Sequence, residues 1–400
     1  NVPLLRFPEF TDEWKESVLS DFVERVKRKN KNNLCKLPLT ISAQYGLVDQ
    51  ISFFNKVIAS ENMSNYYLLH KGDFAYNKSY SSEYPWGAIK RLDCYEQGTL
   101  SSLYICFKPY SHVSSDFLTH YFETSKWHQG ISEIAVEGAR NHGLLNVGIQ
   151  DFFETRHCLP QSLLEQEKIA KFLNLIEERI ATQNKIIEKY ESLIQAMCDT
   201  LIESEQHKVE LAFSDFGKSY SGLSGKSAED FGEGCPYITY MNVYQNQIIN
   251  ATNVGLVKIN GAEQQSVVHY GDILFTLSSE TAEEVGIGAV YLGDTYPLYL
   301  NSFCFGIHII DDNKIFPPFL AFYVSTKSFR KVVFPLAQGS TRFNLQKNDF
   351  MKKGFSFPTV ERQRKIYSAL KTYSDKLAVE KSIAKLLCKQ KNHLLSKLFI

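Results

Sequence analysis

The side chains of this sequence that could carry chemistry are hydrogen-bond donors gathered in short polar segments. Arginine and lysine can donate to the edge of guanine, asparagine can pair with adenine, and hydroxyl groups can bond a phosphate or a base. Residues 77–82 and 139–143 are two such segments, and residues 338–344 are the counterpart of the second one later in the chain. This chemistry selects as candidate DNA contacts Lys78, Tyr80, Arg140, Asn141, Ser278, Ser279, Arg342 and Asn344.

Ordinary solvated loops are the simpler interpretation of these segments, and it suits many of the residues taken one by one. The recurrence of donor-rich loops in both halves of the chain favours recognition instead. A basic run from Arg25 to Lys31, with asparagines beside it, is a further surface of this kind. Both interpretations stay open at this level.

Motifs for catalysis are poorly represented. The chain has no P-loop and no G-x-G-x-x-G fingerprint. Residues 231–234 resemble the glycine-rich turn of S-adenosylmethionine enzymes but lack the acidic partner that should follow, and the Pro-Pro pair within residues 316–319 lacks the polar residue of an adenine methyltransferase loop. Eight cysteines stand singly, without zinc spacing. We expect a chain that is not an enzyme and that has no catalytic residue, metal or cofactor of its own.

Bulk composition limits the partners. The 44 Lys and Arg residues balance the 44 Asp and Glu residues, so a polyanion would have to meet a local patch rather than an overall positive field. The hydrophobic fraction of 44% is enough for two ordinary cores. The first residues do not have the pattern of a signal peptide, and no apolar run reaches membrane-spanning length. We expect a reduced, cytoplasmic protein.

Two long helices organise the rest of the chain. Residues 163–202 contain no glycine or proline, and their apolar residues recur at steps of three and four, which is a heptad seam. The last forty residues repeat this pattern after Pro358. Such a seam needs a partner helix, so we expect the two helices to pair. The helix positions singled out are Gln166, Ile169, Leu173, Ile180, Gln363, Ile366, Leu370 and Leu377.

The pairing of equivalent motifs shows a repeat of about two hundred residues, which indicates a duplicated domain. His70 and Asp73 correspond to His269 and Asp272, and Pro160 corresponds to Pro358. Short aromatic and β-branched runs predict strands early in each half, with helices later. We expect an α+β protein with two mixed globules at residues 1–160 and 204–358. Each globule is followed by a long helix, at residues 161–203 and 359–400, and residues 203–210 are expected to form a hinge.

The chain resembles the specificity subunit of type I DNA restriction–modification systems. The resemblance rests on Pro3-x-x-Arg6-Phe7-Pro8 near the start, on two globules, and on two proline-then-helix junctions with Gln166 and Gln363. It implies that each globule is a target-recognition domain for one half of a split DNA sequence. It also implies that the two helices pair antiparallel as a spacer and dock two methyltransferase subunits, which bind S-adenosylmethionine and flip the adenine. Motor-nuclease subunits would join that core.

One residue departs from this pattern. Arg362 stands where Glu165 stands in the first half, although the resemblance implies an acid at both positions. Docking at that end is therefore in doubt. Two other hypotheses remain: a coiled-coil scaffold that binds proteins without DNA specificity, and a self-sufficient methyltransferase suggested only by residues 231–234 and 316–319.

Overall fold

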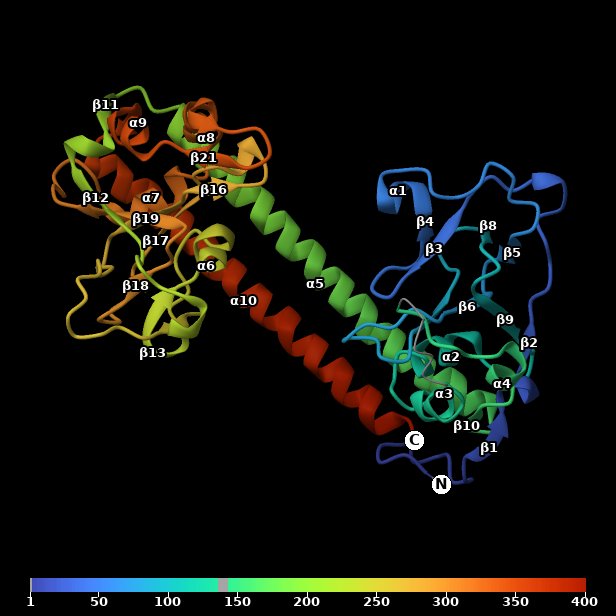
Figure 1. Cartoon of the computed structure of the whole chain (residues 1–400). Coiled ribbons are helices and arrows are strands. Elements are labelled where there is room, and N and C mark those ends of the chain that lie inside the picture. The colour runs from blue at the N-terminus through green and yellow to red at the C-terminus, as the bar shows by residue number, and fades with distance from the viewer. Residues whose placement is uncertain (1, 136–142) are drawn as a thin grey trace. The chain divides into compact units, whose positions relative to one another are not determined.

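The computed structural model describes residues 2–135 and 143–400, and within them the chain divides into two compact units. The first unit comprises Asn1–Gln183 and Ile383–Ile400, and the second comprises Asn184–Ser382. Two long helices, α5 (Leu163–Glu203) and α10 (Val360–Leu398), contribute residues to both units (Figure 1). None of the described helices is both long and apolar enough to cross a membrane.

The first unit is built on a four-stranded antiparallel sheet with three strand pairs around it. The sheet order is β2 (Val23–Arg25), β9 (Ile105–Pro109), β6 (Phe74–Asn77) and β7 (Ala88–Arg91). The pairs are β1 (Lys15–Val18) with β10 (Arg156–Leu159), β3 (Leu39–Ser42) with β4 (Gly46–Asp49), and β5 (Tyr67–His70) with β8 (Gln97–Leu100). The short helices are α1 (Gln50–Phe54), α2 (Ser115–Tyr121), α3 (His128–Ile134) and α4 (Ile149–Phe153).

The second unit repeats this plan. Its central sheet has the order β12 (Gly217–Ser221), β19 (Cys304–Ile309), β15 (Ile273–Thr276) and β17 (Gly288–Val290). Its other strands are β11 (Lys208–Ala212) with β22 (Gly354–Pro358), β14 (Gly255–Val257) with β13 (Phe231–Ile238) and β18 (Tyr299–Leu300), and β16 (Ser278–Ser279) with β21 (Phe343–Leu345) and β20 (Ala337–Gln338). Its short helices are α6 (Tyr240–Gln245), α7 (Pro317–Tyr323), α8 (Lys327–Val333) and α9 (Lys347–Lys352). Single 3₁₀ turns in the two units cover Leu19–Asp21, Lys31–Asn33, Phe213–Asp215, Ala228–Asp230, Ala282–Glu284 and Phe334–Leu336.

The predicted α+β class and the predicted pairing of the long helices are confirmed, and two local expectations need comment. The expected hinge at residues 203–210 is too long, because residues 208–212 are strand β11 and pair with β22. The backbone N–H and C=O groups of β11 form hydrogen bonds with β22, so these residues belong to a sheet and not to a linker. The glycine-rich residues 231–234 lie within β13, and Pro317 opens α7, as a proline at the first helical position should.

Both cores contain residues from both long helices. In the first unit, Ile169 and Leu173 of α5 share a core with Leu395 and Leu398 of α10. In the second unit, Ile194 and Ile202 of α5 share a core with Ile366 and Leu370 of α10. Burial of these side chains gives each helix the apolar contacts that a heptad seam requires.

Ion pairs establish the relative direction of the two helices. In the second unit, Lys381 pairs with Glu191 at 2.7 Å, whereas Arg362, near the start of α10, pairs with Glu205, just beyond the end of α5, at 2.7 Å. In the first unit, Lys391 pairs with Glu177 at 2.6 Å. Lower numbers in α10 thus meet higher numbers in α5, so the helices are antiparallel.

A buried glutamine joins each long helix to its globule. Gln166 accepts a bond from the Ser114 backbone N–H at 2.8 Å and donates to the Pro160 carbonyl at 2.8 Å. Gln363 does the same with the Phe316 N–H and the Pro358 carbonyl, again at 2.8 Å each. The two glutamines are 2% and 0% exposed. Because every partner named here is a backbone group, the same joint forms in both halves despite different neighbouring side chains.

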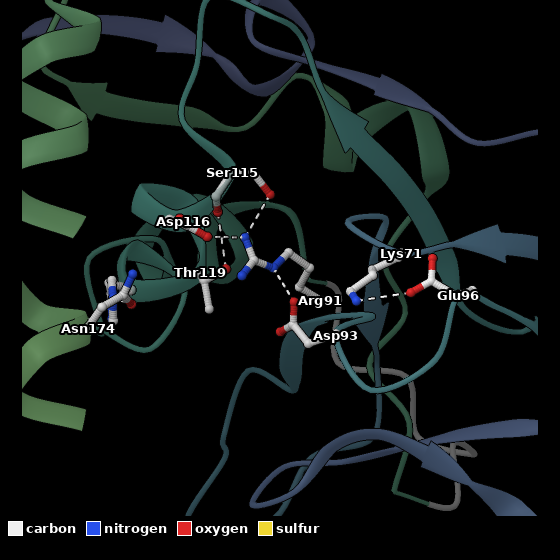
Figure 2. Close-up of polar contacts among 9 residues, drawn as sticks. Lys71, Arg91, Asp93, Glu96, Ser115, Asp116, Thr119 and Asn174 are labelled. Carbon is white, nitrogen blue, oxygen red and sulfur yellow. Dashed lines mark hydrogen bonds and ion pairs between the residues drawn. The ribbon is translucent and has the colours of Figure 1, made fainter. Parts of the chain in front are cut away.

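The start of α2 is fixed to the sheet, and its other side to α5. Arg91 of β7 donates to the Ser115 hydroxyl at 2.9 Å and to the Asp116 carboxylate at 2.7 Å (Figure 2). Asn174 of α5 bonds His120 of α2 at 2.8 Å. Helix α2 thereby transmits the position of α5 to the sheet of the first unit.

Arg362, the residue that departs from the expected pattern, belongs to an ion pair of reversed polarity. In the first unit the helix supplies the acid: Arg6 donates to both carboxylate oxygens of Glu165, at 2.7 and 2.8 Å, and Trp14 donates to one of them at 3.1 Å. In the second unit the helix supplies the base, because Arg362 donates to Glu205 at 2.7 Å. The change of sign at one position is thus matched by a change at the other, and the junction keeps its ion pair.

We expect these two pairs to differ in strength. Replacing Glu165 with Gln should lower the free energy of unfolding by about 2 kcal/mol, because it removes one charge of a pair whose side chains are 12% and 3% exposed. Replacing Arg362 with Gln should cost about 0.5 kcal/mol, since its own side chain is 40% exposed. Denaturant unfolding of the full chain measures both changes, with Glu361→Gln on the exposed face of α10 as control.

Charge reversal tests the polarity argument directly. Arg362→Glu should destabilise the chain through repulsion with Glu205, and the added change Glu205→Arg should recover the loss. Equal stability of the single and double variants would show that the pair does not matter to this junction.

Candidate nucleic-acid interface

The second unit brings the predicted contacts of that half together on one small ladder. Strand β16 pairs with β21, so that Ser278 lies opposite Asn344 and Ser279 lies opposite Phe343. The Leu345 N–H extends the ladder by donating to the Leu277 carbonyl at 2.8 Å. Arg342, directly before β21, and Asn344 are both exposed. The four predicted contacts are therefore neighbours on one ladder, although Ser278 and Ser279 are buried, at 5% and 7% exposed.

The first unit contains the same ladder in the same place. Ser79 forms a bridge with Leu144, the Leu145 N–H donates to the Lys78 carbonyl at 2.9 Å, and the Tyr80 N–H donates to the Gly143 carbonyl at 3.0 Å. The side chain of Tyr80 is 49% exposed. Arg140 and Asn141, the other two predicted contacts of this half, lie outside the described residues. The ladder joins the segment after β6 to residues 143–145, as β16 and β21 join the equivalent segments of the second unit.

A hollow of about 260 Å³ opens beside the ladder of the second unit. Its lining comes from α6, from the segment around β16 and from the loop before β21, and comprises Tyr240, Met241, Tyr244, Ser278, Ser279, Glu280, Glu284 and Arg342. We call this hollow the β16 pocket. Its lining presents hydroxyl, carboxylate and guanidinium groups side by side.

Hydrogen bonds hold the β16 pocket in shape. The Tyr240 hydroxyl donates to the Ser278 carbonyl at 2.8 Å, and the Tyr244 hydroxyl donates to Glu284 at 2.7 Å. Ser279 donates to the other oxygen of Glu284 at 3.3 Å. The bond from Tyr244 is the main reason that the pKa of Glu284 lies below its ordinary value. The carboxylate is therefore charged at neutral pH.

The pocket offers both donors and acceptors. The guanidinium carbon of Arg342 lies 5.7 Å from the centre of the Phe303 ring. The buried hydroxyl of Ser278 has no hydrogen-bond partner among the described residues. Glu280 and Glu284 add carboxylates that can accept from an amino group such as that of cytosine. A surface of mixed sign is suited to base edges and poorly suited to unspecific binding of phosphates.

The sequence did not identify Tyr240, Tyr244 and Glu284 as parts of this site. The two tyrosines stand four residues apart on α6, and their rings stack at 5.9 Å. Their spacing predicts only that they share a helix face. The contact with the serines of β16 depends on tertiary packing, for which the sequence has no local signal.

Most basic side chains of the run from Arg25 to Lys31 make contacts within the first unit. Arg28 forms an ion pair with the buried Asp73. Arg25 donates to the Tyr67 hydroxyl at 3.2 Å, and the Lys29 ammonium lies 3.7 Å from the centre of the Tyr67 ring. Only Lys27 and Lys31 are exposed charges of this run. The run is therefore a weaker candidate for DNA contact than its composition suggests.

The predicted helix positions fall into two groups. Gln166 and Gln363 are the buried joints described above, and Ile169, Leu173, Ile366 and Leu370 lie in the two cores. Ile180 and Leu377 are half-buried on the middle parts of the helices. The structure thus assigns internal contacts to these residues, and partner docking through the helices stays a prediction.

Comparison with known proteins finds one matching family model and several solved structures of similar fold, two of which are described here. Residues 214–387 match the family model of the type I restriction modification DNA specificity domain. The specificity subunit from M. genitalium, of a type I restriction-modification system, is 15% identical and aligns over 100% of this chain and 99% of its own, with a TM-score of 0.53. A structure described as underlying complex assembly and conformational transition of the type I R-M system is also 15% identical, with 97% and 98% coverage and a TM-score of 0.57.

At this identity the two structures establish a shared fold over essentially the whole chain. No curated protein sequence matches this chain.

Arg342 is the residue of the β16 pocket whose replacement is most informative. If it donates to a base edge, Arg342→Ala should weaken binding of the DNA target by about 10- to 100-fold, the value of one bidentate contact. Arg342→Lys should keep the charge but lose discrimination at one base pair. Titration of target and single-mismatch duplexes measures both effects, and exposed Lys353→Ala in the same unit is the matched control.

Full recovery of discrimination by Arg342→Lys would identify a phosphate contact instead. Wild-type affinity in Arg342→Ala would remove Arg342 from the interface.

Proposed function

We propose that this chain reads the DNA target for a type I restriction–modification complex, because its residues 214–387 match the model of the type I restriction modification DNA specificity domain. Each unit reads one half of a split sequence, and the paired helices hold the two readers at a fixed spacing. Two readers that are weak alone bind tightly when both half-sites lie at the matching distance, because the second contact becomes intramolecular.

The observation that carries this proposal is the ladder that recurs in both units. Backbone bonds to the carbonyls of Lys78 and Leu277, at 2.9 and 2.8 Å, support it at equivalent positions. The side chains on it differ between the units, with Lys78 and Tyr80 on one and Ser278 and Ser279 on the other. A common support with different polar groups suits two readers of different half-sites.

The chemistry of modification belongs to partner subunits in this proposal. Methyltransferase subunits bind S-adenosylmethionine and flip the target adenine, while motor-nuclease subunits complete the complex in the cytoplasm. The balanced charge of this chain supports that division, because partners can supply the phosphate neutralisation that DNA binding requires. Specific reading then needs only a few base contacts from each unit.

The test is co-expression with the neighbouring methyltransferase subunit in a host free of adenine methylation, followed by genome-wide mapping of modified adenines. We expect one split motif with a constant gap. Changing Arg342 to Ala should relax one half of that motif and leave the other half intact. A stable complex without methylation would favour the scaffold hypothesis, and failure of the two subunits to co-purify would contradict the proposed partnership.

The spacer role makes a separate prediction. We expect removal of one heptad from each helix, residues 181–187 and 379–385, to keep the phase of the seam and shorten the pair by about 10 Å. The gap in the methylated motif should then shrink by about three base pairs, or methylation should cease because the readers no longer face the same side of the duplex. Removal of residues 181–187 alone is the mismatched control and should abolish assembly. An unchanged gap would exclude the spacer role.

A further inference from the structure

Two histidines and a carboxylate converge at the end of β15 that is remote from the β16 pocket. His269 lies in the turn before β15, Asp272 directly precedes the strand, and His308 belongs to the neighbouring strand β19. One potential ligand atom of each residue lies within 4.8 Å of those of the other two. The mechanism of DNA reading has no use for this cluster.

One carboxylate oxygen of Asp272 accepts hydrogen bonds from a phenol and from the backbone, and the other oxygen accepts from neither within the described part of the chain. Its Oδ2 accepts from the Tyr220 hydroxyl at 2.7 Å and from the His269 N–H at 2.9 Å. Its Oδ1 lies 2.9 Å from Nδ1 of His308. The residue is only 2% exposed, and among the described residues His308 is its one ion-pair partner. A carboxylate buried this deeply is stabilised by hydrogen-bond donors or by a nearby cation.

In the first unit, the equivalent buried aspartate contacts an arginine instead of a histidine side chain. Asp73 occupies the equivalent turn and also accepts from a histidine backbone N–H, that of His70, at 2.7 Å. Its positive partner is Arg28. On β9 the position of His308 is taken by Lys108, which pairs with Glu24 at 2.6 Å. Two halves with one backbone framework thus differ in the side chain that contacts the acid, and only the second half places a second imidazole there, that of His308.

We propose that His269, Asp272 and His308 bind a divalent transition-metal ion of the zinc or nickel class. Two imidazoles and one carboxylate are a usual ligand set for such ions. Ligand atoms at about 2.1 Å from a tetrahedral ion lie about 3.4 Å from each other. The 2.9 Å between His308 Nδ1 and Asp272 Oδ1 is a hydrogen-bond distance, so a bound ion would replace this contact and move the two atoms apart by about 0.5 Å. His269 is exposed, so its ring can turn to complete the set.

The surroundings support an oriented site. The Tyr220 hydroxyl orients the carboxylate of Asp272 through its Oδ2, as the outer partners of metal ligands do. The Tyr220 ring stacks on the His308 ring at 4.2 Å, which fixes the plane of the imidazole. Gly306 allows this, because a side chain at that position would collide with the Tyr220 ring. The first unit has Cys106 at the position equivalent to Gly306, two residues before Lys108. No ring has to be accommodated over that position in the described part of the first unit.

A bound ion would brace β15 and β19 at one end of the sheet whose other end carries the β16 pocket. Its expected effect is therefore on the stability of the second unit, and it is independent of whether the chain reads DNA. The competing state is the direct contact between His308 and Asp272 without any metal.

The test is metal binding by the full-length chain purified without a histidine tag, together with its methyltransferase partner where the two co-purify. After treatment with a chelator, one equivalent of ZnCl₂ or NiCl₂ should remain bound through gel filtration. At a hundredfold excess over the dissociation constant, the metal should raise the melting temperature by about 5–10 °C. Atomic emission and differential scanning fluorimetry measure these two quantities.

Three variants separate the outcomes. His269→Ala changes an exposed residue, so it should fold normally and lose the metal. His308→Gln should also lose the metal. The matched control is His70→Ala, the exposed equivalent in the first unit, which should bind as the wild type does. Equal metal uptake by wild type and His269→Ala, or no uptake by wild type, would overturn the proposal and leave the direct histidine–aspartate contact. Background binding by the cysteines is the same in all variants and cancels.

Discussion

The burial of each long helix in two separate cores is the constraint on which the rest of the structure depends. A helix with a half-apolar face is only marginally stable by itself, and tertiary packing supplies most of its stability. Here Ile169 and Leu173 need Leu395 and Leu398, while Ile194 needs Ile366. Neither core is complete without the helix that follows the other globule in sequence. Folding of the first unit therefore requires the last residues of the chain, including Phe399, whose ring lies 6.4 Å from that of Trp14.

Comparison of the two halves separates what the fold requires from what can diverge. The glutamine joints and the backbone ladders are the same in both, because they satisfy backbone groups that would otherwise be buried without partners. Charged contacts have diverged in a coordinated way. The acid and base of the helix junction have exchanged places between Arg6–Glu165 and Glu205–Arg362, and a buried aspartate is neutralised by Arg28 in one half and faces His308 in the other.

The long helices and the duplicated globules of this protein could be predicted from the sequence. The way in which distant residues come together at the candidate sites could not. Heptad spacing predicted both helices to within a few residues, and the repeat of about two hundred residues predicted two globules of one plan. Loop chemistry selected Ser278 and Arg342 but missed Tyr240 and Glu284, because their meeting depends on packing between segments some forty or more residues apart. The same limit hid the cluster of His269 and His308. Their separation along the chain matches no short metal-binding motif, and only the pairing of β15 with β19 brings them together.

The two joints, one made by Gln166 and one by Gln363, have a consequence for how the sequence of such a protein can evolve. Each glutamine recognises an amide N–H and a proline carbonyl, groups that nearly every sequence of the same shape can offer. A globule can therefore be exchanged for another of the same plan while the helix continues to fit it. Substitutions in the exposed loops of a globule leave these backbone hydrogen bonds unchanged. The globules can therefore vary in sequence while the helices that carry them stay the same.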